Sequence, residues 1–128
     1  DIDAALGAIQ MPSFGISVSH VGFFERGRKV HTIWAGIEGS DAIVRLRDKV
    51  ESAAVRTGCE PEKRKFKPHV TLARLRGVPA RRVSEYLHVQ DGFFAGPFAV
   101  ERFILFRSHL GHGGAHYQTL ADYPLEFG

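Results

Sequence analysis

The sequence lacks the features that would mark a secreted, membrane-spanning or repetitive protein. It has a single cysteine, Cys59, so no disulfide can form within the chain and a reducing compartment fits. No apolar run approaches the roughly 20 residues needed to cross a bilayer, and no low-complexity stretch or linker divides the chain. We therefore expect a cytoplasmic protein that forms one domain over residues 1–128 and makes no membrane contact.

Acidic residues are missing from one stretch of the chain, between Lys63 and Arg82. This stretch holds eight basic residues, whereas the net charge of the whole chain is only +3, so the positive charge is concentrated there. A local field of this kind attracts polyanions and makes their binding sensitive to salt. The alternative interpretation is a solvated surface, which is what most lysine and arginine clusters are.

Within the basic stretch, residues 65–75 read KFKPHVTLARL and predict a strand that presents a histidine and a hydroxyl together. Successive strand side chains point to opposite faces, so His69 and Thr71 share one face while Val70 and Leu72 share the other, buried one. Such a strand can hold a general acid or base beside a phosphate. An ordinary strand with a polar outer face is the competing interpretation, since short motifs often match by chance.

The remaining patterns predict a mixed chain of helices and strands. The expected elements are, in order, a helix over residues 1–10, strands over 14–24 and 30–37, a helix capped by Ser40 and ending near Gly58, the strand around His69, a helix that starts at Pro79 and ends before Asp91, and strands over 98–108 and 115–120. The helix boundaries rest on capping and turn residues at Ser40, Gly58 and Pro79.

The order of these elements also suggests an internal repeat. The last four form strand–helix–strand–strand, and the first three form helix–strand–strand, which is the same unit without its first strand. The first helix shows no evident cap, and the sequence begins with Asp1 rather than methionine. We expect a further strand, carrying a second His-x-Thr, to precede Asp1 in a longer protein.

KFKPHVTLARL resembles the second signature motif of the 2H phosphoesterase superfamily, and above all that of its RNA 2',3'-cyclic phosphodiesterases, also called the 2'-5' RNA ligase family. VGFFERGRKVHTIWAGI resembles the first hairpin of that family, and FILFRSHL and HYQTLADYPL resemble its closing strands. The resemblance implies a bilobal α+β fold with pseudo-two-fold symmetry, antiparallel sheets and flanking helices. Each lobe of that fold contributes one His-x-Thr strand to a shared cleft, and this chain would lack the first strand.

The resemblance implies hydrolysis of RNA 2',3'-cyclic phosphate ends to 2'-phosphates without metal or cofactor, with slow 2'-5' ligation as the reverse reaction. It assigns His69 the general-base role, Thr71 a phosphate contact, and the general acid to a histidine of the first motif. Two imidazoles that titrate near neutrality can divide those tasks. None of the other six histidines has a hydroxyl residue two positions later, so we expect little activity from this chain alone.

Three further residues near the motif are candidates for substrate contact. The family places an arginine at the position of Arg74 near the phosphate, although strict alternation puts Arg74 on the face opposite His69 unless a bulge or the end of the strand turns it round. Phe66 is a candidate for stacking on a terminal base, and Lys67, which precedes a proline and is therefore extended, is a weaker candidate for substrate binding. An exposed salt-bridging arginine and an ordinary core aromatic are the alternatives.

The other histidines are explained more simply by structural roles. His109, His112 and His116 lie in a glycine-rich run that contains no carboxylate or thiolate, so a polar turn is favoured over a metal site. His20 and His31 fit structural histidines of strands. Two other functions stay open, namely hydrolysis of a small cyclic nucleotide phosphate and a non-catalytic RNA-binding module that lost one histidine. The oligomeric state is not determined by the sequence.

Overall fold

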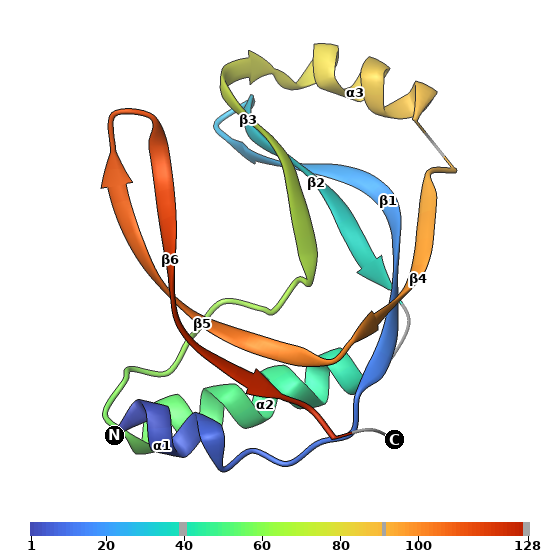
Figure 1. Ribbon diagram of the computed structural model, residues 1–128. Coiled ribbons are helices and arrows are strands. Elements are labelled where there is room, and N and C mark those ends of the chain that lie inside the picture. The colour runs from blue at the N-terminus through green and yellow to red at the C-terminus, as the bar shows by residue number, and fades with distance from the viewer. Residues whose placement is uncertain (39–40, 91, 127–128) are drawn as a thin grey trace. The chain divides into compact units, whose positions relative to one another are not determined.

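Figure 1 shows the computed structural model of the chain, which describes residues 1–38, 41–90 and 92–126. The elements are α1 (Ile2–Gly7), β1 (Phe14–Arg26), β2 (Lys29–Glu38), α2 (Asp41–Arg56), β3 (His69–Pro79), α3 (Ala80–Val89), β4 (Phe94–Val100), β5 (Arg102–Gly111) and β6 (Gly114–Pro124). The α+β class predicted from the sequence is confirmed. Within the described ranges, every helix is too short or too polar to span a bilayer.

The largest difference from the predicted elements lies in the last third of the chain. The single strand expected over residues 98–108 is wrong, because β4 and β5 are separate strands with Glu101 between them. The pattern hides β4 because Gly96 and Pro97 normally weaken strands. They fit here because β4 is the outermost strand of its sheet, and a Cβ atom at Gly96 would lie only 3.1 Å from Ser17 Cα of β1.

The first helix is shorter than expected and has a cap that the pattern did not reveal. α1 ends at Gly7 and not near residue 10. Asp1 is its N-cap, because the Asp1 carboxylate accepts a hydrogen bond from the backbone N–H of Asp3 at 3.0 Å. The expectation of an uncapped first helix is therefore wrong. The predicted Ser40 cap of α2 falls outside the described residues.

The chain divides into two compact units, each built from segments that lie far apart in the sequence. The terminal unit comprises Asp1–Phe14, Asp41–Lys63 and Ala99–Gly128, and the central unit comprises Gly15–Ser40 and Arg64–Phe98. The repeat expected from the element order does not coincide with these units, because the first hairpin, β1 and β2, shares a sheet with β3 and β4. Each unit thus combines early and late parts of the chain.

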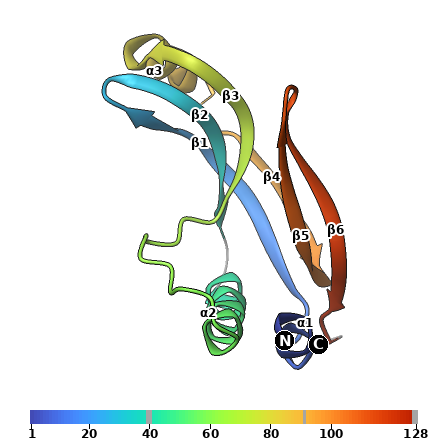
Figure 2. The same cartoon turned by 90° about the vertical axis from the view of Figure 1, so that its left-hand side faces the viewer.

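The central unit is built on a four-stranded sheet with the strand order β3-β2-β1-β4. β1 and β2 form an antiparallel hairpin whose turn contains Gly27 in the left-handed conformation, with φ of 56°, and β2 pairs antiparallel with β3. Figure 2 shows these three strands running side by side along a strong curve. Val30 and Ala35 of β2 are fully buried, and α3 packs against β2 and β3.

In the terminal unit, α1 lies beside α2 and contacts β6 of the β5–β6 hairpin. Two small clusters of buried residues form its core: Met11, Ala42, Leu46 and Leu125, and Leu6, Ala53 and Tyr123. α2 contributes to both clusters because its apolar residues recur every three or four positions and so follow one face of the helix. The core of this unit therefore depends on α2.

Tyr123 joins β6 to α1 through a single polar contact. Its hydroxyl donates a hydrogen bond to the Asp3 carboxylate at 2.6 Å, and its ring stacks on Phe103 with 4.9 Å between centroids. The hydrogen bond to Asp3, followed by desolvation and by the negative charge of Asp3, raises the pKa of Tyr123 to about 12. The neutral phenol is thus favoured in the folded protein.

We expect the Tyr123 phenol to ionise near pH 12 rather than at its ordinary value of 10.0. Because the pKa is raised in the folded state, the stabilisation is complete below pH 10 and is lost as the pH rises through 12. The difference between ultraviolet titrations of the wild type and Tyr123→Phe isolates this group. Asp3→Asn should move the midpoint back toward 10.0, and an unmoved midpoint would contradict the assigned cause.

Candidate active site

β3 carries the predicted motif and forms the outer strand of the central sheet. The strand begins at His69, directly after Pro68, which has no N–H to donate to a ladder. His69 lies opposite Gly36 of β2, and Thr71 lies opposite Trp34. The predicted strand is confirmed, and it places the imidazole and the hydroxyl on the same face of the sheet.

A β-bulge at Leu72 decides on which face Arg74 lies. Thr71 and Ala73 pair with consecutive residues of β2, so Leu72 between them is an extra residue in β3. Such an insertion shifts the alternation of side chains by one position. Arg74 therefore lies on the face of Thr71 and the motif histidine, and not on the opposite face that strict alternation gives.

The apolar residues of the motif are less buried than the sequence suggested. Val70 is 44% exposed and Leu72 is 52% exposed. Among the described residues, β3 has a neighbouring strand on one side only, and Leu72 is displaced by the bulge, so the central sheet encloses neither side chain. The prediction that this strand buries Val70 and Leu72 is wrong.

The His69 imidazole is oriented by a hydrogen bond to the main chain. Its Nδ1 lies 2.6 Å from the carbonyl oxygen of Lys67. A carbonyl can only accept, so Nδ1 carries the proton, and in the neutral ring Nε2 keeps its lone pair. Since His69 is exposed, Nε2 can accept a proton from a water molecule, as a general base must.

The two weaker candidates, Phe66 and Lys67, lie in the segment just before β3 and not in the strand itself. Phe66 is 37% exposed. Lys67 is exposed, and its contact with His69 is made by the backbone carbonyl rather than by the ammonium group. The contact that the structure assigns to Lys67 is therefore one that any residue type with the same backbone conformation would make.

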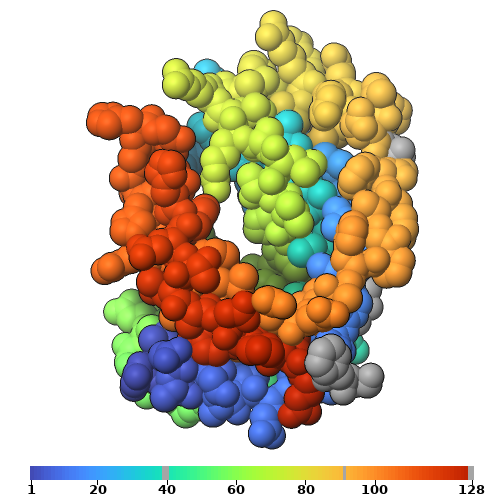
Figure 3. All heavy atoms as spheres, in the orientation of Figure 1, coloured from blue at the N-terminus to red at the C-terminus, as the bar shows by residue number. Residues whose placement is uncertain are grey.

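All eight basic residues between Lys63 and Arg82 are exposed. Figure 3 shows the side chains of β3, in yellow-green, on the visible surface of the central unit. Among the described residues, Arg74 has no ion-pair partner. The guanidinium charge on the His69 face is thus available to an anionic ligand.

Two aromatic residues lie against His69. The ring centroid of Phe24 in β1 is 5.2 Å from that of His69, and the ring centroid of Trp34 in β2 is 6.2 Å from it. Phe24 and Trp34 also contact each other, with 5.5 Å between centroids. Only the register of three paired strands, which local sequence does not give, brings them to the histidine.

The other histidines do not join this cluster of rings. His20 lies at a bulge in β1 with φ of 62°, and its exposed Nε2 is 2.6 Å from the Glu38 carboxylate. In the β5–β6 hairpin, His109 lies opposite His116, and its Nε2 is 3.1 Å from the Gln118 side-chain oxygen. Across the part of the chain that the structure describes, no three histidine, cysteine, aspartate or glutamate side chains gather as a metal site requires.

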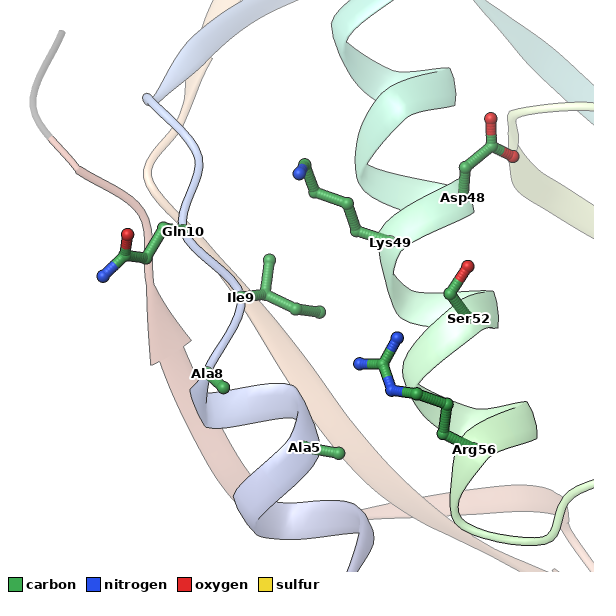
Figure 4. Close-up of a pocket in the computed structure, with 8 residues that line it drawn as sticks. All are labelled: Ala5, Ala8, Ile9, Gln10, Asp48, Lys49, Ser52 and Arg56. Atoms are coloured by element: carbon green, nitrogen blue, oxygen red, sulfur yellow. The ribbon is translucent and has the colours of Figure 1, made fainter.

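A groove of about 600 Å³ lies between α1 and α2 in the terminal unit (Figure 4). Ile9 projects toward α2, and Lys49 and Arg56 extend from α2 toward the α1 side. These two cations are exposed on the polar face of an amphipathic helix, where solvated lysine and arginine are usual. The groove contains none of the motif residues, and we assign it no ligand.

The fold and the motif together define an α+β protein that presents His-x-Thr and an arginine on one strand face. Residues 37–117 match the family described as LigT like Phosphoesterase. An RNA 2',3'-cyclic phosphodiesterase of Aeropyrum pernix is 33% identical over 126 residues, which cover 95% of this chain and 70% of that protein. An RNA 2',3'-cyclic phosphodiesterase of Thermotoga maritima is 30% identical over 117 residues, which cover 91% of this chain and 61% of that protein. The chain belongs to the LigT-like phosphoesterase family.

Solved structures show the same fold. A Thermus thermophilus protein matches with a TM-score of 0.73 at 25% identity, over 98% of this chain and 69% of that one. Escherichia coli LigT complexed with 3'-AMP matches with a TM-score of 0.70 at 25% identity, over 97% of this chain and 66% of the LigT chain. The chain spans 61% of the length of the Thermotoga maritima relative and 62% of that of the Escherichia coli RNA 2',3'-cyclic phosphodiesterase.

We expect the neutral His69 ring to carry its proton on Nδ1, because the Lys67 carbonyl accepts from that nitrogen. Long-range ¹H–¹⁵N NMR spectra at alkaline pH distinguish the protonated from the unprotonated ring nitrogen. His88, exposed on α3, is the comparison histidine in the same unit. A proton found mainly on Nε2 of His69 would contradict the hydrogen bond to Lys67.

Proposed function

We propose that this chain hydrolyses RNA 2',3'-cyclic phosphate ends to 2'-phosphates, with His69 as the general base. The observation that carries the proposal is that His69, Thr71 and Arg74 lie on one face of β3, to which the bulge at Leu72 brings the arginine. The relatives from Aeropyrum pernix and Thermotoga maritima, both named RNA 2',3'-cyclic phosphodiesterase, support the choice of substrate.

In the proposed reaction, His69 Nε2 takes a proton from a water molecule as the water oxygen attacks phosphorus. The bond from phosphorus to the ribose 3' oxygen breaks, and this oxygen takes up a proton as it leaves, so the product carries a 2'-phosphate. The Thr71 hydroxyl donates to a phosphoryl oxygen, and the Arg74 guanidinium pairs with the phosphate. Both contacts stabilise negative charge as it develops on the phosphoryl group.

The proton donor for the leaving oxygen is a second group that the proposal requires. The family resemblance assigns it to the histidine of another His-x-Thr motif, and His69 begins the one such motif in this chain. A positioned acid or base contributes about 10²–10⁴ in rate. We therefore expect hydrolysis by this chain alone to be slow and to be accelerated by an external proton donor such as imidazolium.

The same groups account for ligation as a parallel reaction with another nucleophile. If a 5'-hydroxyl attacks the cyclic phosphate in place of water, the product is a 2'-5' linkage and the proton transfers are unchanged. Neither reaction requires a metal ion or an organic cofactor, because the nucleophile is activated by imidazole and the phosphate is held by Thr71 and Arg74.

A non-catalytic RNA-binding module is the second candidate, and the presence of only one His-x-Thr in the sequence favours it. Both functions use the phosphate contacts of Thr71 and Arg74, but only hydrolysis uses Nε2 of His69. A small cyclic nucleotide is a poorer fit, because eight exposed cations between Lys63 and Arg82 suit several phosphates better than one.

The decisive assay is hydrolysis of a short RNA ending in a 2',3'-cyclic phosphate, with EDTA and with increasing imidazole. We expect turnover to rise with imidazole and to fall by at least about tenfold in His69→Ala, since a general base contributes about 10²–10⁴. His88→Ala removes a different exposed histidine of the same unit and should have no effect. Turnover in His69→Ala equal to that of the wild type would exclude the proposed base, and binding without turnover in the wild type would indicate the binding module.

Arg74→Gln is expected to weaken binding of an RNA with a terminal 2'-phosphate, because it removes one cation from the His69 face. The slope of log affinity against log salt should become shallower by about one. Arg28→Gln removes the same charge at the β1–β2 turn of the same unit and serves as the control. Fluorescence anisotropy at several salt concentrations measures both, and equal losses in the two variants would contradict a local phosphate contact.

A further inference from the structure

We propose that Trp34, whose indole ring packs over Gly22, positions the His69 imidazole for its role as general base. The inference rests on the function proposed above and adds two residues that lie outside the motif. Neither Gly22 nor Trp34 transfers a proton or holds phosphate in the proposed reaction. Trp34 acts through His69, and Gly22 acts through Trp34.

The first step of the argument is the space that Gly22 leaves open. Gly22 of β1 lies directly opposite Trp34 of β2 in the strand ladder. A Cβ atom at Gly22 would lie 2.4 Å from one atom of the indole ring and 2.5 Å from another. Real Cβ atoms do not approach other heavy atoms so closely. The indole therefore lies over the backbone of β1 only because residue 22 has no side chain.

The second step is the contact between this ring and the histidine. The indole lies 6.2 Å from the His69 ring between centroids, and Phe24, which packs on the indole, meets His69 at 5.2 Å with an angle of 84° between planes. The Lys67 carbonyl holds Nδ1 of the same imidazole. Two aromatic rings and one hydrogen bond thus limit the orientations that His69 can adopt.

The third step is the cost of having tryptophan at this position. The indole Nε1 is buried and has no hydrogen-bond partner among the described residues. A buried donor without an acceptor destabilises the fold, and a phenylalanine would fill much of the same space without that penalty. The burial of apolar surface alone does not account for Trp34. The contact of a large flat ring with Phe24 and His69 does account for a tryptophan at this position.

Positioning matters here because His69 starts an edge strand and is exposed. An exposed side chain at a strand end otherwise samples several rotamers. A misplacement of about 1 Å of a catalytic group can cost on the order of 10²-fold in rate. A ring contact that narrows the rotamers of His69 therefore acts on turnover more than on substrate affinity.

Gly22→Ala tests the proposal without altering any group that touches substrate. We expect the His69 ring nitrogens to shift from a single Nδ1–H tautomer toward a mixture in ¹H–¹⁵N spectra. We also expect kcat to fall about tenfold to a hundredfold while KM changes less than about twofold. Gly15→Ala is the matched control in β1, because its Cβ would find its nearest neighbour at 3.8 Å, an ordinary contact. Gly15→Ala should change neither the His69 tautomer nor kcat.

A second pair of variants gives the same test if Gly22→Ala does not fold. Trp34→Phe keeps a flat ring beside His69, and Trp34→Leu keeps apolar volume without a ring. We expect Trp34→Phe, whose ring is smaller, to depart partly from the wild-type His69 spectrum and turnover, and Trp34→Leu to depart further from both. Wild-type His69 spectra in both Gly22→Ala and Trp34→Leu would overturn the proposal.

The two readouts separate failure of this inference from failure of the proposed function. The tautomer of His69 is measured without turnover, so a protein that does not hydrolyse the RNA still tests the positioning. Altered His69 spectra in Gly22→Ala with no hydrolysis by the wild type would reject the enzyme and keep the positioning. Hydrolysis that depends on His69 but is unaffected by Gly22→Ala and Trp34→Leu would reject the positioning and keep the enzyme.

Discussion

The alternation of side chains along a β-strand is the constraint on which this site depends. Residues of one strand share a face only when an even number of positions separates them, and Arg74 fails that condition relative to His69 and Thr71. The extra residue in β3, Leu72, changes the count. An imidazole, a hydroxyl and a guanidinium are thereby held on one face of one strand, with no loop required to bring any of them there. The geometry of the site is therefore a property of the strand ladder.

Local sequence patterns are sufficient for much of the fold and insufficient where a residue's neighbours lie far away in the chain. The hairpin of β1 and β2, the motif strand and the helices follow from apolar spacing and from residues such as Pro79 at the start of α3. β4 does not follow from these patterns, because Gly96 and Pro97 are acceptable only in an edge strand that lies close to β1. The division into two units also escapes the pattern, since the pairing of β1 with β4 is not visible in either segment alone.

The candidate site also has a part that local sequence predicts and a part that it does not. The shared face of His69 and Thr71 follows from a period of two, which the letters display directly. The contacts of His69 with Phe24 and Trp34 depend on how three strands are aligned, and that alignment is altered by bulges at His20 and Leu72. Neither bulge can be predicted from the residue types in the sequence. The resemblance to a family could point to Arg74, but only the register explains how that arginine reaches the histidine's face.

The position of β3 at the edge of its sheet has a consequence for association between copies of the protein. One row of backbone N–H and C=O groups on β3 has no strand partner within the described residues, and such a row is a template for another strand. Arg74 and Arg76 are exposed along this strand, so a second β3 approaching the edge would bring like charges against them. Cations suited to attracting a phosphate thus also oppose edge-to-edge pairing. Salt weakens both effects together, which links the attraction of an anionic ligand to the resistance against self-association.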